Sequence, residues 1–343
     1  MAKTNPGRFF EDYTLGEVIV HAVPRTVSGG ERALYHALYP ARHALASSDA
    51  FAQSCGLPAS PLDDIAAFHV VFGKTVPDIS LNALANLGYA EGHWLRPVWP
   101  GDTLRSESEV IGLKQNSNGK SGVVWVRTRG FNQHDDVVIE YVRWAMVRKR
   151  DLERPAPEPV IPDLQEAVTP DQLVIPEGLD FSGYDFALAG EPHRFGDYEI
   201  GETIDHVDGV TVEEAEHMLA TRLWQNTAKV HFDATQREDG RRLIYGGHVI
   251  SMARALSFNG LANAQVVVAL NGGAHANPCF AGDTIRAWSE VLDKAETAAP
   301  GVGALRLRLV ATKGGAPFRL RGENGKYLPE VLLDLDYWAL IPL

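Results

Sequence analysis

The 343-residue sequence is poor in cysteine, carries more acidic than basic residues and contains no long apolar run. Its two cysteines, Cys55 and Cys279, are too few for a disulfide framework and do not lie in the spacing of a zinc site. The net charge of −12 argues against nucleic acid and anionic membranes as partners. With no apolar stretch long enough to cross a bilayer, the sequence predicts a cytoplasmic protein without a membrane partner.

Nucleotide-binding and metal-binding motifs are missing as well. The glycine pairs at 29–30 and 272–273 do not follow the pattern of a P-loop or of a dinucleotide-binding turn. The histidines, His275 included, show no spacing that selects a metal. We therefore expect neither a metal nor a cofactor.

The strongest positive signal is an internal duplication. The Asp-Tyr-x-x-Gly-Glu motif at 12–17 recurs at 197–202, and several residues that follow it are repeated at the same offset of 185. The register then slips by four, so that Gly-Asp-Thr at 101–103 meets Gly-Asp-Thr at 282–284, which in both places predicts a turn before a strand. The chain therefore contains two copies of one unit.

A third correspondence closes each copy, where Arg143 and Tyr337 each precede a Trp-Ala pair. These matches predict an N-terminal unit at 1–150 and a C-terminal unit at 193–343. Residues 151–192 between them are rich in proline, which predicts a semi-extended connector.

Each unit contains two predicted helices. The first is expected to open at a threonine cap, Thr26 in one unit and Thr211 in the other, where Glu214 completes a capping box. The second, at 61–74 or 247–259, is too apolar around its whole circumference for a surface helix. The rest of the unit must therefore enclose it.

Alternating apolar and polar residues predict strands after the apolar helix, most clearly at 123–129, 137–142, 305–310 and 331–336. A buried helix with several antiparallel strands in each unit predicts an α+β fold, in which a sheet wraps around a central helix. We expect the two sheets to pair edge to edge as a pseudo-dimer within the chain. A further homodimer of whole chains is an open alternative.

The chemistry is expected in the second unit, in two neighbouring stretches. In the first, Asn226 lies five residues before His231 in a polar loop. In the second, Gly246 and Gly247 lead into the apolar helix, so that backbone N–H groups point at any ligand there. His231 can exchange a proton near neutral pH, and the amide of Gly247 can hold a developing oxyanion. A buried structural histidine and a turn asparagine are the alternative interpretations of His231 and Asn226.

These motifs together resemble the MaoC-like, R-specific enoyl-CoA hydratases of the hotdog fold, and the duplication resembles their double-hotdog members. Three stretches, at 71–82, 116–126 and 245–251, are similar to the mesaconyl-CoA hydratases of this family, also called β-methylmalyl-CoA dehydratases. The resemblance covers nearly the whole chain. It implies an acyl-CoA substrate, with CoA as part of the substrate and no separate cofactor.

The family's catalytic pair is an aspartate and a histidine in the pattern D-x-N-P-x-H. His231 keeps the histidine, whereas Asn226 stands where the family has the aspartate. At the offset of 185, the first unit has Ala41 and Ala46 at these positions. The resemblance therefore implies that the second unit is catalytic and that the first lines the substrate groove.

Asparagine cannot accept a proton, so either His231 performs every proton transfer or a carboxylate from elsewhere takes part. The sequence leaves five candidates for that carboxylate open: Glu31, Asp63, Asp64, Glu216 and Asp233.

Further residues are candidates for substrate contacts. In the first unit, Ser60 as N-cap, Pro61 as first helical residue, Leu62 and Asp63 open the apolar helix and are expected to contact the ligand. Tyr245 is expected to pack with its hydroxyl tethered. A free carboxylate on the substrate would need a cation, and the arginines that flank the predicted site in sequence are Arg241, Arg242 and Arg254.

The leading hypothesis is a hydro-lyase that interconverts mesaconyl-CoA and β-methylmalyl-CoA. One alternative is an acyl-CoA thioesterase, which also uses hotdog folds. The other is a non-catalytic protein that binds a CoA ligand, because the alanines of the first unit show that catalytic side chains can be lost from such a unit.

Overall fold

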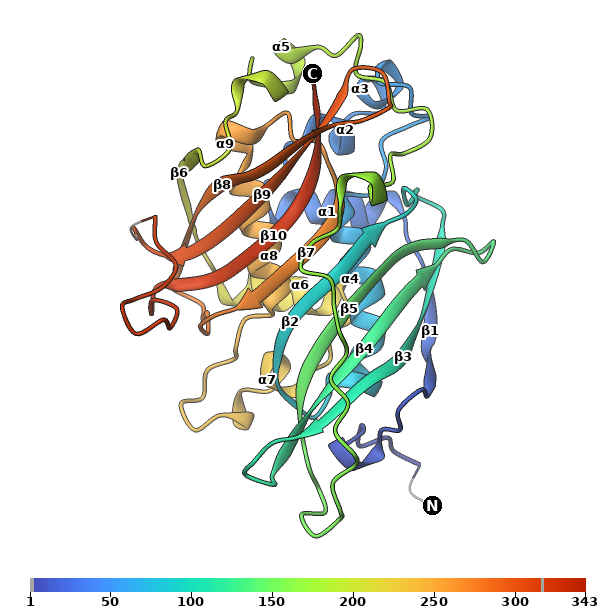
Figure 1. Ribbon diagram of the computed structural model, residues 1–343, viewed down its shortest axis with the longest axis vertical. Helices are drawn as coiled ribbons and strands as arrows, with labels where there is room; N and C mark the ends of the chain where they lie inside the picture. Colours follow the sequence, from blue (N-terminus) through green and yellow to red (C-terminus); the bar gives the residue numbers. More distant parts are fainter. Residues whose placement is uncertain (1–2, 316–317) are drawn as a thin grey trace.

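The computed structural model describes residues 3–315 and 318–343. Its strands form one antiparallel ten-stranded sheet in the order β1-β3-β4-β5-β2-β7-β10-β9-β8-β6 (Figure 1). The first half of the chain supplies β1 (Val18–Thr26), β2 (Ala83–Trp94), β3 (Thr103–Gln115), β4 (Ser121–Phe131) and β5 (Val137–Arg148). The second half supplies β6 (Thr203–Thr211), β7 (Val266–His275), β8 (Thr284–Glu296), β9 (Val302–Lys313) and β10 (Val331–Pro342).

The two halves join where β2 pairs with β7, with Tyr89 opposite Gly273 and Gly92 opposite Leu270. Each half therefore contributes five strands, and the junction continues the sheet without an exposed edge. This arrangement confirms the predicted α+β double hotdog with edge-to-edge pairing inside the chain.

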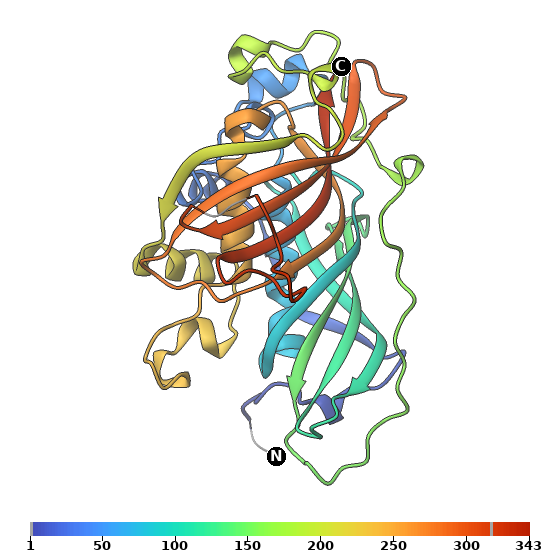
Figure 2. The same cartoon turned by 60° about the vertical axis from the view of Figure 1, so that its left-hand side comes forward.

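A central helix fills the concave side of each half-sheet. Helix α4 (Asp64–Thr75) is buried at every residue after its first, and so is α8 (Gly246–Leu256). The two helices contact each other, and His69 of α4 lies 2.7 Å from the Ser251 hydroxyl of α8. Figure 2 shows both helices on the side of the sheet opposite the extended part of the connector that precedes α5.

Shorter elements complete each half. The α-helices are α1 (Gly29–Leu38), α2 (Ala44–Ser47), α3 (Asp49–Ser54), α5 (Phe186–Ala189), α6 (Glu214–Leu223), α7 (Lys229–Phe232) and α9 (Phe258–Leu261). Single turns of other helix types are η1 (Phe10–Asp12), η2 (Val76–Ser80), η3 (Pro170–Gln172), η4 (Phe195–Asp197) and η5 (Ala234–Gln236). Within the described ranges, no helix is long and apolar enough to span a bilayer.

The predicted threonine caps are wrong, because both threonines end strands. The hydroxyls of Thr26 and Thr103 lie 2.7 Å apart, and in the second half Thr211 and Thr284 form the same pair at 2.8 Å. Helix α1 is instead capped by Ser28, and α6 follows Glu213.

The predicted start of the first apolar helix is also wrong. Asp63, and not Ser60, is the N-cap, since its carboxylate accepts a bond from the Ile65 N–H at 2.9 Å. Ser60 bonds to Asp49 and Arg32 in the preceding segment. The apolar run therefore begins three residues before the helix does.

The Gly-Asp-Thr motifs form the predicted turns. The Asp102 carboxylate accepts a bond from the Trp99 N–H at 2.8 Å, and Asp283 accepts one from the Phe280 N–H at the same distance. The matching geometry in both halves confirms a structural role for the motif.

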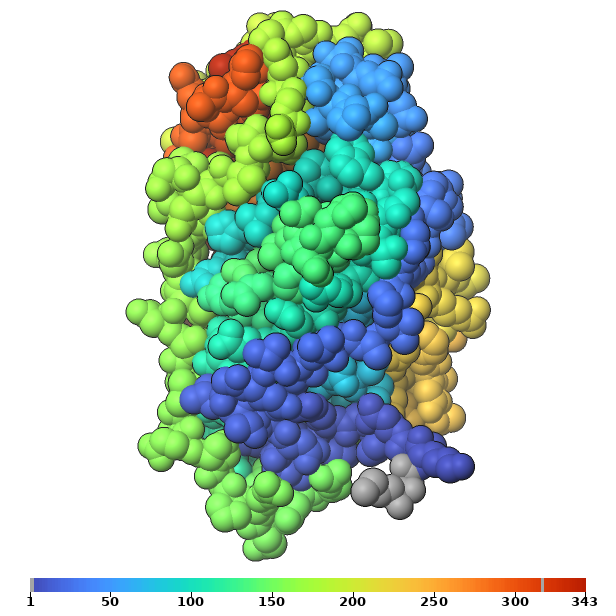
Figure 3. Space-filling view, turned by 90° about the vertical axis from the view of Figure 1, so that its right-hand side faces the viewer, coloured from blue at the N-terminus to red at the C-terminus, as the bar shows by residue number. Residues whose placement is uncertain are grey.

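The connector crosses the face of the sheet opposite the central helices. Val160 bridges to Leu113 of β3, and the Trp338 indole of β10 donates to the Val168 carbonyl at 2.9 Å. In the space-filling view of Figure 3, the connector (yellow-green) forms a band along one side of the first half. The segment therefore ties the outer faces of the two half-sheets together.

Candidate active site

A cavity of about 330 Å³ lies between the two halves. From the first half it is lined by Phe72, Ser80, Asn86, Tyr89 and Arg143, among others. From the second half its walls include Asn226, His231, Tyr245, Gly246 and His275. Neither half alone could form this cavity.

His231 lies on the single-turn helix α7. One of its ring nitrogens is hydrogen-bonded within the protein, and the other can bond to a ligand. Its Nδ1 lies 2.7 Å from the Leu243 carbonyl, which can only accept, so Nδ1 carries the proton and Nε2 is left as the acceptor. Burial lowers the pKa of His231 to about 4, against the opposing effect of the Leu243 bond. At neutral pH the side chain is therefore a neutral imidazole that can take up a proton.

Asn226 lines the same cavity and is only 2% exposed. Its carbonyl oxygen accepts a bond from the Ala228 N–H at 3.3 Å, which holds the turn leading into α7. The side chain therefore has the turn role that its residue type favours and also faces the cavity.

Two glycines form the entrance of α8. Gly246 lines the cavity, and Gly247 lies directly behind it, buried. A Cβ on Gly246 would overlap the His275 ring, and one on Gly247 would overlap the Tyr245 ring. Because the first N–H groups of a helix have no intrahelical acceptor, this entrance offers donors to a ligand that approaches Gly246.

Tyr245 is the N-cap residue of α8 and packs as expected with a tethered hydroxyl. The hydroxyl lies 3.0 Å from Nδ1 of His69, and burial raises the pKa of Tyr245 well above its ordinary value. Its ring centroid is 6.0 Å from that of His231. Tyr245 therefore forms a rigid wall beside the imidazole.

His275, which the sequence analysis left without a role, is a second imidazole in the cavity. It ends β7, its Nε2 lies 3.1 Å from the Tyr89 hydroxyl, and burial lowers its pKa to about 4. The duplication holds a signal that could have identified it: at the offset of the Gly-Asp-Thr motifs, His275 meets Trp94 in the first half.

The arginines expected to bind a substrate carboxylate do not line the cavity. Arg242 is paired with Glu214 on the surface, and Arg241 donates to the Ala281 carbonyl. Arg254 is buried on α8, where it donates to the Ala264 carbonyl. The cavity instead contains Arg143 of β5, which the sequence analysis missed.

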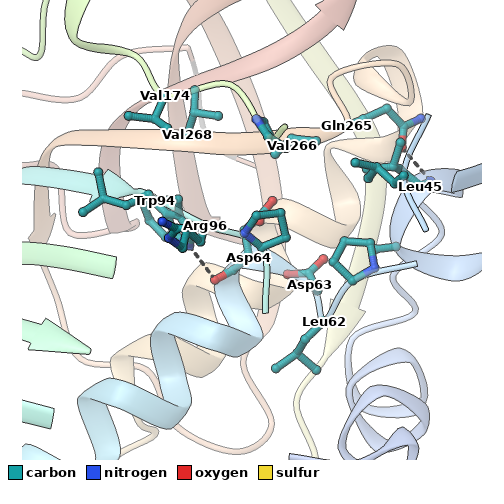
Figure 4. Close-up of a pocket in the computed structure, with 16 residues that line it drawn as sticks. Leu45, Leu62, Asp63, Asp64, Trp94, Arg96, Val174, Gln265, Val266 and Val268 are labelled. Atoms are coloured by element: carbon teal, nitrogen blue, oxygen red, sulfur yellow. Dashed lines mark hydrogen bonds between the residues drawn. The ribbon is translucent and has the colours of Figure 1, made fainter. Parts of the chain in front are cut away.

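A second, much smaller cavity, of about 20 Å³, lies at the start of α4, the place that corresponds to the entrance of α8, and β7 and the connector also line it (Figure 4). Ala46 and Trp94 line it where the duplication places His231 and His275 in the other half. The Trp94 indole fills the space and donates to the Asp64 carbonyl at 2.8 Å. This cavity has no room for a thioester.

Pro61, Leu62 and Asp63 line this small cavity and not the one that holds His231. Ser60 lies outside both. The structure therefore separates these four residues from the predicted chemistry, because the start of α4 faces its own closed site.

None of the described residues that line the large cavity is an aspartate or a glutamate. Each of the five candidate carboxylates is engaged elsewhere: Glu31 with Arg25, Asp63 as an N-cap, Asp64 with the Val267 N–H, Glu216 with the Glu213 N–H and Asp233 with the Thr235 N–H. In the described part of the chain, no group of three His, Cys, Asp or Glu side chains could hold a metal ion.

Comparison with known proteins gives a consistent result. A family model described as mesaconyl-CoA hydratase matches residues 1–315. The chain is 79% identical over 341 residues to a mesaconyl-CoA hydratase of Cereibacter sphaeroides, covering 99% of both chains. It is 58% identical over 349 residues to a β-methylmalyl-CoA dehydratase of Chloroflexus aurantiacus, again covering 99% of both.

Solved structures show the same relationship. A MaoC domain protein of Chloroflexus aurantiacus superposes with a TM-score of 0.97 at 57% identity, covering 100% of this chain and 99% of the other. A Mycobacterium tuberculosis protein with a double hotdog fold superposes with a TM-score of 0.77 at 27% identity, covering 98% of each. The architecture and the sequence thus point to one family.

Proposed function

This chain belongs to the mesaconyl-CoA hydratase family, and we propose that its large cavity catalyses the reversible hydration of mesaconyl-CoA to β-methylmalyl-CoA. The enzyme is accordingly a hydro-lyase. The observation that carries the proposal is one cavity that contains a neutral imidazole with a free Nε2 and the open entrance of a buried helix.

Hydration adds the hydroxyl of water to the β-carbon and a proton to the α-carbon of the enoyl thioester. In the proposed reaction, Nε2 of His231 takes a proton from the attacking water, and the resulting imidazolium returns a proton to the α-carbon. Asn226, on the same wall, orients the water. Because no carboxylate lines the cavity among the described residues, His231 and His275 are its only imidazole or carboxylate groups for proton exchange.

Negative charge develops on the thioester oxygen as water attacks. The N–H groups of Gly246 and Gly247, at the start of α8, are the proposed donors to this oxygen. Both positions require glycine, because a Cβ would overlap the His275 ring at Gly246 and the Tyr245 ring at Gly247. One such donor contributes about 2.7–4 kcal/mol of transition-state stabilisation. Gly246 has the more direct role because it lines the cavity.

The thioesterase alternative finds less support, because water attack on the carbonyl would use a carboxylate and none lines the described cavity wall. A further homodimer and a cytoplasmic location stay predictions.

The decisive test compares His231→Gln with wild type on mesaconyl-CoA. We expect wild type to consume the enoyl absorbance without releasing free thiol, and His231→Gln to lose about 100-fold to 10,000-fold in kcat/KM. His134→Gln, on an exposed loop, is the matched control and should behave as wild type. Thiol release by wild type would instead identify a thioesterase, and full activity of His231→Gln would remove its proposed role.

A further inference from the structure

Arg143 is fully buried, and its charge has no counterion among the residues that the structure describes. Its guanidinium donates to the Thr75 hydroxyl at 2.7 Å and lies 3.4 Å from the Ser80 hydroxyl. Among the described residues, no carboxylate lies within ion-pair distance of it, and its Nε has no hydrogen-bond partner. Arginines elsewhere on the sheet differ: Arg127 pairs with Glu91, and Arg306 with Asp336.

The neighbourhood of Arg143 offers no compensating anion. The titratable groups that act on it are tyrosines, namely Tyr13, Tyr89, Tyr141 and Tyr245, and burial lowers the pKa of the guanidinium. Burying a charge without a partner is costly, and a guanidinium stays charged even so. An anionic ligand in contact with Arg143 would remove that cost.

The position of Arg143 relates it to the proposed chemistry. Its guanidinium carbon lies 4.3 Å above the Phe72 ring, and the Phe72 and Tyr245 rings are 5.9 Å apart. The Tyr245 ring in turn neighbours His231. A series of contacts through the Phe72 and Tyr245 rings thus connects Arg143 to His231, and all four residues line the cavity.

A second polar group points to the same end of the cavity. Asn86 of β2 lines it, and both its amide nitrogen and its carbonyl oxygen are buried without a hydrogen-bond partner. Asn86 pairs with Ala145, two residues from Arg143 along β5. Unpartnered amide atoms beside an unpaired guanidinium are what a missing polar ligand would leave.

The duplication shows that this charge is particular to the first half. Arg143 corresponds to Tyr337, which precedes the second Trp-Ala pair. Tyr337 is also buried, but it lines a small cavity of about 10 Å³, into which the central helix α8 and not the strand brings a cation, Arg254. At this position of the closing strand, a described cation therefore occurs only in the first copy, where β5 lines the large cavity.

We propose that Arg143, assisted by Asn86 and Ser80, binds the free carboxylate of an unsaturated dicarboxylic acyl thioester and selects such substrates over monocarboxylic enoyl thioesters. This inference rests on the proposed function. In a mesaconyl thioester the free carboxylate is bonded to the β-carbon, the atom that water attacks. Holding that carboxylate therefore fixes the β-carbon relative to His231.

The test compares two thioesters that differ in one group. Mesaconyl-CoA carries the free carboxylate, and 2-methylcrotonyl-CoA has a methyl group in its place. We expect Arg143→Gln to lower kcat/KM for mesaconyl-CoA by about 100-fold to 1,000-fold and to change that for 2-methylcrotonyl-CoA by less than about fivefold. Arg241→Gln, outside the cavity, is the matched control and should leave both values unchanged.

Because Arg143 is buried, folding of each variant is checked by circular dichroism. If Arg143→Gln does not fold, Asn86→Asp is used instead. The new carboxylate competes with the substrate carboxylate for the guanidinium, so it should lower kcat/KM for mesaconyl-CoA more than for 2-methylcrotonyl-CoA. An unchanged ratio of the two kcat/KM values in either folded variant would overturn the inference.

Binding separates this inference from the proposed function. Wild type should bind the saturated analogue succinyl-CoA more tightly than butyryl-CoA in calorimetry, and Arg143→Gln or Asn86→Asp should abolish the difference. If wild type hydrates neither enoyl thioester but shows this preference, the proposed reaction fails while the carboxylate site stands. Equal Kd values for the two analogues in wild type would refute the carboxylate site itself.

Discussion

At the scale of single residues, the protonation state of His231 decides what it can do. The Leu243 carbonyl fixes the tautomer of the ring. Burial lowers the pKa of His231 to about 4, so the ring stays neutral even at pH values well below 6.5. In the family pattern an aspartate would stand at Asn226, and a carboxylate in this cavity would favour the imidazolium. An amide at this position therefore keeps His231, the proposed base, in its proton-accepting form.

Asn226→Asp should reverse this effect. The new carboxylate should raise the pKa of His231 from about 4 towards its ordinary value. Since protonated His231 cannot act as the base, the acid limb of kcat/KM should move to higher pH, by about one to two pH units. The pH profile of mesaconyl-CoA hydration measures this shift. Asn118→Asp, on an exposed turn, should leave the limb in place, and an unmoved limb in Asn226→Asp would contradict the electrostatic argument.

The sequence predicts part of this site and not the rest, for a physical reason. His231, Tyr245 and Gly246 lie in two neighbouring stretches of the sequence, so their spacing shows that they belong together. His275 and Arg143 come from strands β7 and β5, which reach the cavity only through the pairing of the sheet. Strand order across the junction cannot be read from spacing, so these two side chains could be found only as mismatches between the copies.

At the scale of elements, the entrance of α8 combines close packing with the proposed role of its N–H groups as oxyanion donors. Gly246 lets the helix approach the His275 ring, and no larger residue fits without moving that ring.

The apolar run in the sequence predicts helix α8 well, but the residue at which a helix starts is less predictable. At α4 the first turn is set by the Asp63 cap, and the apolar Pro61 and Leu62 precede it.

Gly246→Ala should therefore impair catalysis more than folding. The added methyl group displaces His275 and narrows the approach to the helix entrance, for an expected loss of about 100-fold in kcat/KM. Gly272→Ala on β7 is the matched control, because the nearest heavy atom to its new Cβ lies 4.0 Å away. Steady-state kinetics and melting temperatures test both variants, and wild-type kinetics in Gly246→Ala would contradict the close approach.

Asp64, the first residue of α4, makes stability depend on pH. Burial, followed by the charge of Asp63, raises its pKa to about 8 from an ordinary value of 3.8. A pKa raised on folding means that the bound proton stabilises the fold fully below the unfolded pKa, and that this stability is lost as the pH rises through about 8.

Asp64→Asn should remove this dependence, since an amide oxygen can still accept the Val267 N–H but cannot ionise. Its free energy of unfolding relative to wild type should increase from about pH 5 to about pH 9 in urea titrations. Asp171→Asn, exposed in the connector, should show no such trend. A difference that stays constant with pH would show that Asp64 is ionised in the folded protein.

At the scale of the whole molecule, the β2–β7 junction makes the two halves one structure. It joins the half-sheets and also brings the Tyr89 hydroxyl within 3.1 Å of His275 Nε2 in the cavity that both halves line. The duplication and the edge pairing are predictable from sequence because they follow from repeated motifs and from the need to cover sheet edges. The unequal size of the two sister cavities is not, because it depends on how Trp94 packs.

Gly92→Val tests the junction. A Cβ at Gly92 would lie 2.6 Å from the Leu270 Cβ on the paired strand, so the strands must separate locally. We expect a loss of about 1–3 kcal/mol in stability, with tryptophan fluorescence and hydratase activity lost together in one urea transition. Gly272→Ala on the facing strand should unfold as wild type does. Two separate transitions in Gly92→Val would show that the halves unfold independently.

The filled sister cavity has a consequence for stoichiometry. A symmetric pair of identical subunits would present two equivalent mouths, but here Trp94 and Asp64 plug one of them. Each chain should therefore saturate with a single equivalent of thioester. Because the two mouths are not equivalent, a charge such as Arg143 can line one of them alone, whereas an exactly twofold assembly would place it at both.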